Sequence, residues 1–408
     1  MLNKVWLSFF LISFVAAMYT WLIQGDYNVF NALVESIFKM ANLSVEIAIG
    51  LIGVLAFWCG ILKLAEHSGM AHALARMLGP LFSRLMPGVP KGHPALGYIT
   101  MNMASNMMGL DNAATPMGLK AMESLQQLNS DKEVASNAQI LFLVLNTSSV
   151  TVFPITIIMY RLQQGASSPT EVFLPILLAT IASSIAGVLA VAFIQKINLF
   201  NRVIMSYLGG MFVLVASLIV WLQQYPAEQM GELSAAVGNG LLFSVIVLIL
   251  LVAHSKKVAV YEGFIEGAKE GFEIAVKIIP YVVAMLVAIG VLRASGVLDL
   301  LVNLISGALS FIGMSTAFVD ALPTAIMRPF SASGSRAMML ETMSTHGVDS
   351  FVAKLASVMQ GSTETTFYVL AVYFGSVGIK RVRHAIGCGL FADFTGMIAA
   401  IIICYWFF

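Results

Sequence analysis

Residues 98–117 read YITMNMASNMMGLDNAATPM, and residues 320–339 read DALPTAIMRPFSASGSRAMM. Both stretches mix small, polar and helix-breaking residues with Met, Leu, Ile and Phe. A solvated loop would lack the apolar residues, and a helix that crosses a membrane would lack the polar ones. We therefore expect residues 98–122 and 320–345 to form broken or re-entrant helices, because freed backbone groups at membrane depth must face protein or water.

The composition of the whole chain places these two stretches in a membrane protein. Of 408 residues, 59% are hydrophobic and 11% are charged, and the mean hydropathy is +0.89. A soluble domain carries about 25% charged residues, so a soluble enzyme is excluded and a lipid bilayer is the expected environment. The net charge of +1, with no long basic stretch, argues against nucleic acid as a partner.

Apolar segments that could cross a bilayer recur along the chain. A transmembrane helix needs about 20 mainly apolar residues. The segments that approach this length are 5–23, 43–62, 139–160, 172–195, 203–222, 238–253, 274–292, 297–318, 350–378 and 384–408. We interpret the first as a retained helix, because no clear cleavage site follows it. Together they predict an all-α polytopic membrane protein.

The two broken stretches hold matching places in an internal repeat. The other matched segments are VEIAIGLI (45–52) with FEIAVKII (272–279), the dipeptide Ser-Gly at 68 and at 295, and NTSSVTVF (146–153) with GSTETTFY (361–368). Inverted repeats with broken helices at corresponding positions are typical of secondary transporters, whose site lies near the midplane. We expect residues 1–200 and 259–408 to contain two inverted repeats, joined by transmembrane helices in 201–258. The alternative is a duplication kept only for packing.

Hydroxyl-rich motifs inside apolar segments supply the first candidate site residues. Residues 146–151 and 362–366 each gather several Ser and Thr side chains. Glu364 stands out because an ionisable residue in a membrane segment is costly and is a functional hypothesis by default. It could coordinate a cation, relay a proton or bind a substrate. Alternatively, it forms only a structural ion pair with Arg328 or Arg336.

The broken stretches supply further candidates. Arg328 and Arg336 flank a Gly- and Ser-rich segment that leads into a helix, an arrangement that favours anions. The full set of candidate substrate-binding residues is Asn102, Asn106, Asp111, Asn112, Asn146, Thr147, Ser148, Arg328, Ser331, Ser333, Ser335, Ser362, Thr363 and Glu364. Asp393 is a second candidate for a buried functional acid, or merely the partner of a basic neighbour. The sequence lacks the hydrolase, zinc-protease and phosphate-loop signatures, so we expect no catalytic residue, cofactor or metal site.

The motifs also resemble known families. NMASNMMGLDNAATPMGLKAM (102–122) and the Asn-Thr-Ser-Ser motif at 146 resemble spore maturation protein A. LPTAIMRPFSASGSRA (322–337) and QGSTETTFY (360–368) resemble spore maturation protein B. The resemblance covers nearly all of the chain and implies a natural fusion of the two. Both families are similar to the nucleoside-recognition (Gate) domain of concentrative nucleoside transporters and of the membrane part of ferrous-iron transport protein B, which implies paired re-entrant hairpins.

The sequence and this resemblance together predict a multi-pass transporter or permease of the bacterial inner membrane. Its expected cargo is a small polar solute, with nucleoside-like molecules or organic anions ahead of metal ions. A coupling ion and a homo-oligomer are further partners that the sequence leaves open. One alternative is a non-transporting assembly or recruitment protein in envelope or spore physiology. A membrane enzyme acting on lipid-linked substrates is a third reading, weakened by the missing catalytic signature.

Overall fold

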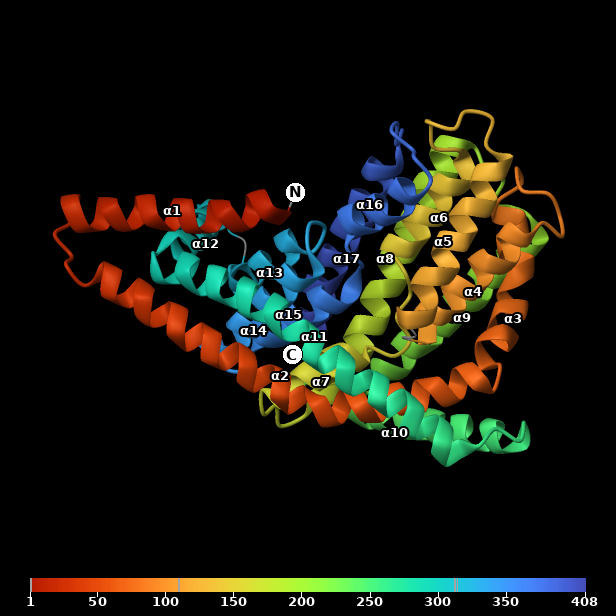
Figure 1. The fold of residues 1–408 in the computed structure, drawn as a ribbon, viewed down its shortest axis with the longest axis horizontal. Helices are drawn as coiled ribbons and strands as arrows, with labels where there is room; N and C mark the ends of the chain where they lie inside the picture. Colours follow the sequence, from red (N-terminus) through yellow and green to blue (C-terminus); the bar gives the residue numbers. More distant parts are fainter. Residues whose placement is uncertain (1, 109–110, 312, 314) are drawn as a thin grey trace.

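Helices make up the fold. The computed structural model describes residues 2–108, 111–311, 313 and 315–408, and none of these residues forms a strand beyond one isolated bridge. Seven helices are long and apolar enough to cross a membrane. They are α1 (Leu2–Ile23), α2 (Val29–His67), α8 (Phe173–Gln195), α9 (Arg202–Leu222), α10 (Ala227–Ser255), α11 (Val260–Ala294) and α17 (Ala385–Phe407) (Figure 1). The prediction of an all-α polytopic membrane protein is confirmed.

Three of the ten predicted apolar segments are not continuous spans. The segment 139–160 divides into α6 (Asn137–Thr147) and α7 (Ile155–Gln163), and the segment 350–378 divides into α15 (Phe351–Ser362) and α16 (Thr366–Ser376). The third, 297–318, stops early as α12 (Val297–Phe311). Pro154, directly before α7, has no backbone N–H and so cannot continue the hydrogen-bonding ladder of α6. At the other break Thr363 is extended, with φ −147° and ψ 173°.

The two predicted broken stretches form helical hairpins. In the first, α4 (Pro94–Met108) packs against α5 (Asp111–Leu128); in the second, α13 (Leu322–Met327) packs against α14 (Ala332–His346). The Ser331 hydroxyl accepts a 3.0 Å bond from the backbone N–H of Gly334 and so caps the start of α14. Neither stretch is a straight spanning helix or an exposed loop, as the sequence predicts.

The same order of elements occurs twice. A long helix, a shorter helix, a hairpin, a broken helix and a spanning helix follow one another from α2 through α3 (Met70–Leu85) to α8, and again from α11 to α17. The matched Ser-Gly dipeptides end α2 and α11 alike, because Gly69 (φ +74°) and Gly296 (φ +76°) both take the left-handed conformation that glycine adopts without strain. This geometry agrees with the repeat alignment made from the sequence.

The two corresponding long helices run antiparallel, side by side (Figure 1). Gly263 lies against Leu64, Gly271 against Leu55, and Gly290 against Met40, so the contacts on α2 move backwards as α11 advances. Corresponding helices of opposite direction are what an inverted repeat requires. The predicted inversion therefore has direct geometric support in this pair.

Glycine spacing permits the close approach of α2 and α11. Gly263, Gly267 and Gly271 are spaced four residues apart on one face of α11, the pattern that lets membrane helices pack backbone to backbone. A Cβ atom on Gly271 would lie 2.6 Å from the carbonyl oxygen of Leu55. This pattern is not among the predictions made from the sequence, although the four-residue glycine repeat is readable without the structure.

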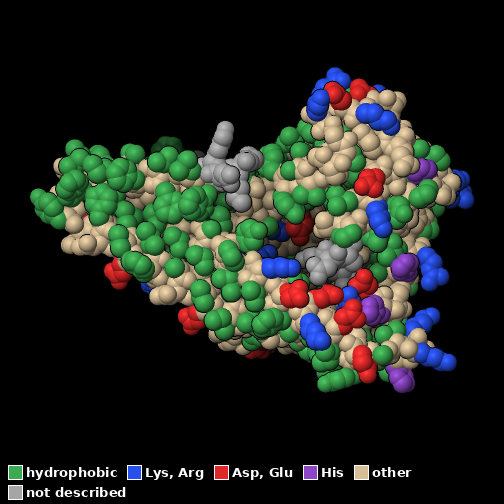
Figure 2. Space-filling view, viewed as in Figure 1, with side chains coloured by type: hydrophobic (Ala, Val, Ile, Leu, Met, Phe, Trp, Pro, Cys, Tyr) green, Lys and Arg blue, Asp and Glu red, His purple; other side chains and the backbone are tan. Residues whose placement is uncertain are grey.

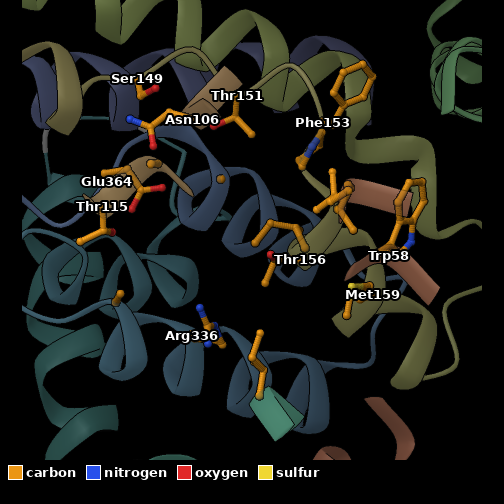
Figure 3. A pocket seen from close by; sticks show the side chains of 18 of the residues that line it. Trp58, Asn106, Thr115, Ser149, Thr151, Phe153, Thr156, Met159, Arg336 and Glu364 are labelled. Atoms are coloured by element: carbon orange, nitrogen blue, oxygen red, sulfur yellow. The ribbon is translucent and has the colours of Figure 1, made fainter. Parts of the chain in front are cut away.

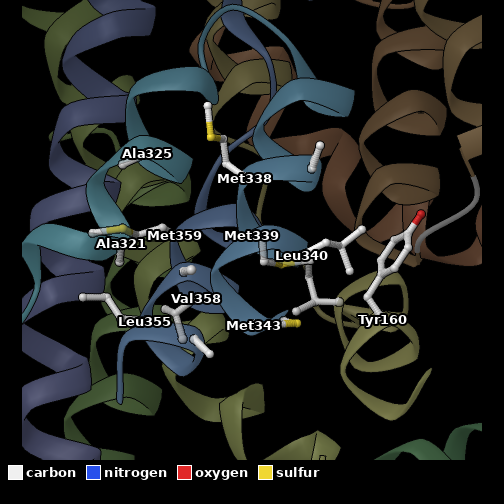
Figure 4. Packing of buried hydrophobic residues seen from close by; sticks show 14 of the residues in the cluster. Tyr160, Ala321, Ala325, Met338, Met339, Leu340, Met343, Leu355, Val358 and Met359 are labelled. Carbon is white, nitrogen blue, oxygen red and sulfur yellow. The ribbon is translucent and has the colours of Figure 1, made fainter. Parts of the chain in front are cut away.

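The largest buried cluster lies between the second hairpin and its broken helix. Met338, Met339, Leu340 and Met343 of α14 pack against Leu355, Val358 and Met359 of α15, as Figure 4 shows. This packing fixes the second hairpin against α15. By contrast, large apolar side chains such as Phe193, Phe212 and Leu251 are exposed on α8, α9 and α10, as expected of helices that face lipid.

Candidate functional site

A cavity of about 520 Å³ lies where both hairpins and both broken helices meet. Figure 2 shows a hollow in the face of the molecule that it depicts, with acidic and basic side chains gathered around it, whereas the surface over α1 is mainly hydrophobic. Figure 3 shows Asn106, Thr115, Ser149, Thr151, Arg336 and Glu364 around the cavity. Its other polar lining residues are Lys63, Glu66, Asn146, Thr156, Glu270, Arg328, Gln360, Tyr368 and Tyr373.

An amide network builds the wall of the cavity from the first hairpin. The Asn106 amide of α4 donates a 3.0 Å hydrogen bond to Asn146 Oδ1 at the end of α6. The Tyr373 hydroxyl of α16 donates to the same oxygen at 3.4 Å and accepts a 3.3 Å bond from the Asn102 amide. Asn102 also donates to the Ala114 carbonyl of α5 at 2.7 Å. Four helices are thereby held together by buried polar groups.

Removing the Tyr373 hydroxyl tests this network. We expect Tyr373→Phe to lower the free energy of unfolding by about 1–2 kcal/mol, because two hydrogen bonds are lost. Thermal unfolding of the purified protein in detergent measures the change. Tyr368→Phe is the matched control, since the Tyr368 side chain is exposed and should leave the stability unchanged. Equal losses of stability in the two variants would contradict the assignment of the Tyr373 hydroxyl to this network.

The break between α15 and α16 is held by groups from the rest of the chain. The Glu364 backbone N–H donates a 2.7 Å hydrogen bond to the Thr147 carbonyl at the end of α6, so the two broken helices are joined directly. Arg328 donates from Nε (2.7 Å) and from Nη2 to the Thr363 carbonyl. The Phe367 N–H donates to the Pro329 carbonyl at 3.0 Å. Hydrogen bonds with the second hairpin therefore hold the break between α15 and α16 in place.

Glu364 and Arg328 form an ion pair at the edge of the cavity. Arg328 Nη2 lies 3.3 Å from Glu364 Oε2, and the Arg328 side chain is 6% exposed while that of Glu364 is 51% exposed. The structural ion pair left open by the sequence is therefore present. Because Glu364 also lines the cavity, pairing does not remove its carboxylate from contact with a solute.

The surroundings of Arg336 differ from those of Arg328. Its guanidinium lies 5.3 Å from the centre of the Tyr160 ring, and Nη1 donates a long 3.5 Å hydrogen bond to the Tyr160 hydroxyl. Its Nε is buried without a hydrogen-bond partner, and no carboxylate of the described residues forms an ion pair with it. Arg336 thus presents a positive charge to the cavity that the described part of the chain does not neutralise with an acid.

The structure separates the predicted site residues into two groups. Asn106, Asn146, Arg328 and Glu364 line the cavity. The hydroxyls of Thr147, Ser148 and Ser362 instead donate to carbonyls three or four residues earlier in their own helices. Five more predicted site residues lie outside the cavity lining. Asn102 belongs to the amide network, Thr363 to the break, and Ser331 and Ser333 to the start of α14. The Ser335 hydroxyl bonds to the Thr324 carbonyl and to Gln360. The side chains of Asp111 and Asn112 lie outside the described residues.

Some lining residues are absent from the set of predicted substrate-binding residues. Ser149 and Thr151 belong to the 146–151 motif and could have been included from it. Lys63 and Glu270, which pair at 2.7 Å, come from the long helices α2 and α11. No local motif marks them, because their nearness depends on the antiparallel pairing of those helices.

Comparison with known proteins agrees with this architecture. The chain matches the nucleoside-recognition (Gate) family over residues 48–163 and 275–380, more than half of its length. It is 41% identical over 189 residues to spore maturation protein A of Bacillus subtilis (strain 168), covering 46% of this chain and 93% of that protein. It is 52% identical over 155 residues to spore maturation protein B of the same organism, covering 38% of this chain and 85% of that protein. No solved structure matches the chain.

The two matched family segments coincide with the site. Residues 48–163 contain α4 to α7, and residues 275–380 contain α13 to α16, so each segment supplies one hairpin and one broken helix. The resemblance predicted from the motifs is confirmed. The chain is a multi-pass membrane protein, similar to both spore maturation proteins, and it belongs to the nucleoside-recognition (Gate) family.

Proposed function

We propose that this protein is a transporter or permease of the bacterial inner membrane that binds a small polar solute between its two repeats. In this proposal residues 1–200 and 259–408 contain the repeats, and 201–258 connects them. The observation that carries it is the cavity of about 520 Å³, lined by polar as well as apolar side chains, at the meeting point of both hairpins and both breaks. Cavities of about 300–1,000 Å³ accommodate small-molecule ligands. Packing alone gives no reason to place unwound backbone around such a space.

The lining residues indicate the kind of solute. Asn106, Thr115 and Gln360 offer neutral hydrogen-bonding groups, while Trp58 and Phe153 offer aromatic surface. A molecule with a ring and several polar groups, such as a nucleoside-like solute, matches this mixture. Arg336 favours a solute that also carries an anionic group, because it brings a positive charge without an acidic partner among the described residues.

The geometry also suggests how the repeats could act together. Glu364 lies in the break of one repeat, and its backbone binds the end of α6 in the other. Its side chain pairs with Arg328 at the end of the second hairpin. A solute that contacts Glu364 would therefore act on both repeats at once. Relative movement of repeats around a fixed site is the usual basis of alternating access.

Two variants test the proposal. We expect Arg336→Gln and Glu364→Gln each to reduce solute uptake into proteoliposomes about 10- to 100-fold. The expected size is that of a lost hydrogen bond to a charged group, about 1.5–3 kcal/mol. Candidate solutes would first be screened as nucleosides and small organic anions, by their ability to raise the thermal unfolding temperature of the purified protein. Arg381→Gln and Glu133→Gln are matched controls, because these residues form exposed ion pairs.

The alternative reading predicts a different result. If no screened solute raises the unfolding temperature or crosses the membrane, while Arg336→Gln and Glu364→Gln variants still restore the phenotype of a deletion strain, the protein acts as an assembly or recruitment partner. Normal uptake by both variants would show that Arg336 and Glu364 do not belong to the solute-binding site.

A further inference from the structure

A buried carboxylate lies at the break between α15 and α16, outside the cavity lining. Asp393 of α17 is 1% exposed. Its Oδ2 accepts a 2.6 Å hydrogen bond from the Thr366 hydroxyl. Its Oδ1 has no hydrogen-bond partner among the described residues, and neither do the hydroxyls of Thr363 and Thr365, which are 2% and 1% exposed. Three buried oxygen atoms around one break thus lack a partner, which is rare in folded proteins.

Two glycines bring α17 against this break. A Cβ atom on Gly396 would lie 2.8 Å from Thr363 Cγ2, and a Cβ atom on Gly389 would lie 2.9 Å from Thr366 Cγ2. The side chains of Thr363 and Thr366 therefore pack against α17 on either side of Asp393.

The helices around Asp393 contribute few charges. The helices α6, α8 and α16 contain no Asp, Glu, Lys, Arg or His. In α15, Lys354 pairs instead with Glu171 at 2.9 Å. The remaining charged or titratable groups of α10 and of the start of α17 lie near the helix ends: Glu228, Glu232, His254, His384 and Cys388.

Arg328 and Glu364 are the charged side chains near enough to Asp393 to influence its charge electrostatically. These two pair with each other at 3.3 Å, and Arg328 also donates to the Thr363 carbonyl. The positive charge of Arg328 is thus already shared with Glu364. A bare carboxylate at Asp393 would be a second negative charge in a buried site, which is costly in a membrane segment.

We propose that Asp393 is a proton-binding site, in which a proton on Oδ1 donates a hydrogen bond to the Thr363 hydroxyl, and that gain or loss of this proton regulates the cavity. One proton removes the buried charge and gives Oδ1 a hydrogen that it can donate to a neighbouring oxygen. When the proton leaves, the Asp393 carboxylate competes with Glu364 for Arg328. This regulatory role rests on the proposed solute function, whereas the proton site itself does not.

Infrared difference spectroscopy tests the site without any solute. The full chain in lipid vesicles would be compared at low and high pH, following the carbonyl stretch of a protonated, buried carboxylic acid. We expect Asp393→Asn to abolish this band and the control Glu364→Gln to retain it. Persistence of the band in Asp393→Asn would overturn the assignment. Loss of the wild-type band on adding Na⁺ at constant pH would indicate a metal-cation site and would also overturn it.

The Thr363 hydroxyl gives a second, independent test should Asp393→Asn fail to fold. We expect Thr363→Val to shift the frequency of the band and Thr363→Ser to restore it, because only the serine variant keeps the hydrogen-bond acceptor. An unchanged band in Thr363→Val would contradict the proposed bond.

The regulatory role is measured separately. Once a solute is known, we expect a pH gradient to accelerate uptake by the wild type but not by Asp393→Asn. Uptake that responds equally in both would exclude regulation by this proton. If the infrared band behaves as expected while no solute is transported, the proton site stands and the proposed function fails, so the two outcomes are distinguishable.

Discussion

Replacing Arg161 by Met is expected to lower the free energy of unfolding by about 3–5 kcal/mol, the usual cost of breaking a buried ion pair by removing one partner. The Arg161 side chain of α7 is 0% exposed. Its Nη2 lies 2.5 Å from Glu171 Oε1 and 3.6 Å from Asp349 Oδ1, and Nη1 donates to the Val348 carbonyl at 3.2 Å. Without the guanidinium, Glu171 keeps only Lys354 as a cationic partner among the described residues.

This cluster joins the two repeats, which is why the expected loss is large. Arg161 follows the break of the first repeat, and Asp349 precedes the broken helix of the second. Burial alone would raise the pKa of the Asp349 carboxyl, but hydrogen bonds from Ser167 and the positive charges of Arg161 and Lys354 hold that pKa below its ordinary value. The cluster therefore stabilises the charged form of Asp349 in the folded protein.

Chemical or thermal unfolding in detergent measures the effect of Arg161→Met. The matched control is Lys380→Met, because Lys380 and Glu133 form a 2.6 Å ion pair whose side chains are 72% and 56% exposed. An exposed pair contributes at most about 1 kcal/mol, so the control should unfold almost as the wild type does. Similar losses in both variants would mean that burial of the Arg161 cluster does not determine its contribution.

The double variant Gly267→Ala, Gly271→Ala is expected to separate the long helices α2 and α11. A Cβ atom on Gly267 would collide with the Cys59 carbonyl oxygen, and one on Gly271 would lie 2.6 Å from the Leu55 carbonyl oxygen. Both obstacles are backbone atoms, which cannot move aside without shifting a helix. Overpacking costs about 1–3 kcal/mol for each position, and the higher helix propensity of alanine offsets only about 1 kcal/mol of it.

The readout is the unfolding temperature together with crosslinking between cysteines placed on the two helices. Gly209→Ala, Gly210→Ala in α9 is the control, because a Cβ atom on either residue would meet no heavy atom within 4 Å. We expect the control to keep or slightly raise the stability. A stable double variant of α11 with unchanged crosslinking would exclude backbone-to-backbone packing of this pair.

The sequence by itself determined the membrane setting, the helical class, the repeat and the two hairpins. Each of these depends on local content. A stretch such as 98–122 carries too many polar groups for a lipid-facing span and too many apolar groups for a loop, whatever the rest of the chain does. The same local logic identified Glu364 as an unusual residue and Arg328 as one of its two partners, and the structure selects Arg328 at 3.3 Å.

Only the tertiary structure decided which groups satisfy the unwound backbone and which side chains meet. The segments 139–160 and 350–378 are apolar enough to predict helices, and yet both break. Unwinding is tolerated because groups far away in sequence form hydrogen bonds with the backbone groups that the break leaves free. The Glu364 N–H donates to the Thr147 carbonyl, and the Thr363 carbonyl accepts from Arg328. Hydropathy and periodicity report on neighbours along the chain, whereas these hydrogen bonds join residues 35 or more positions apart. The composition of the cavity and the surroundings of Asp393 follow from such long-range pairings.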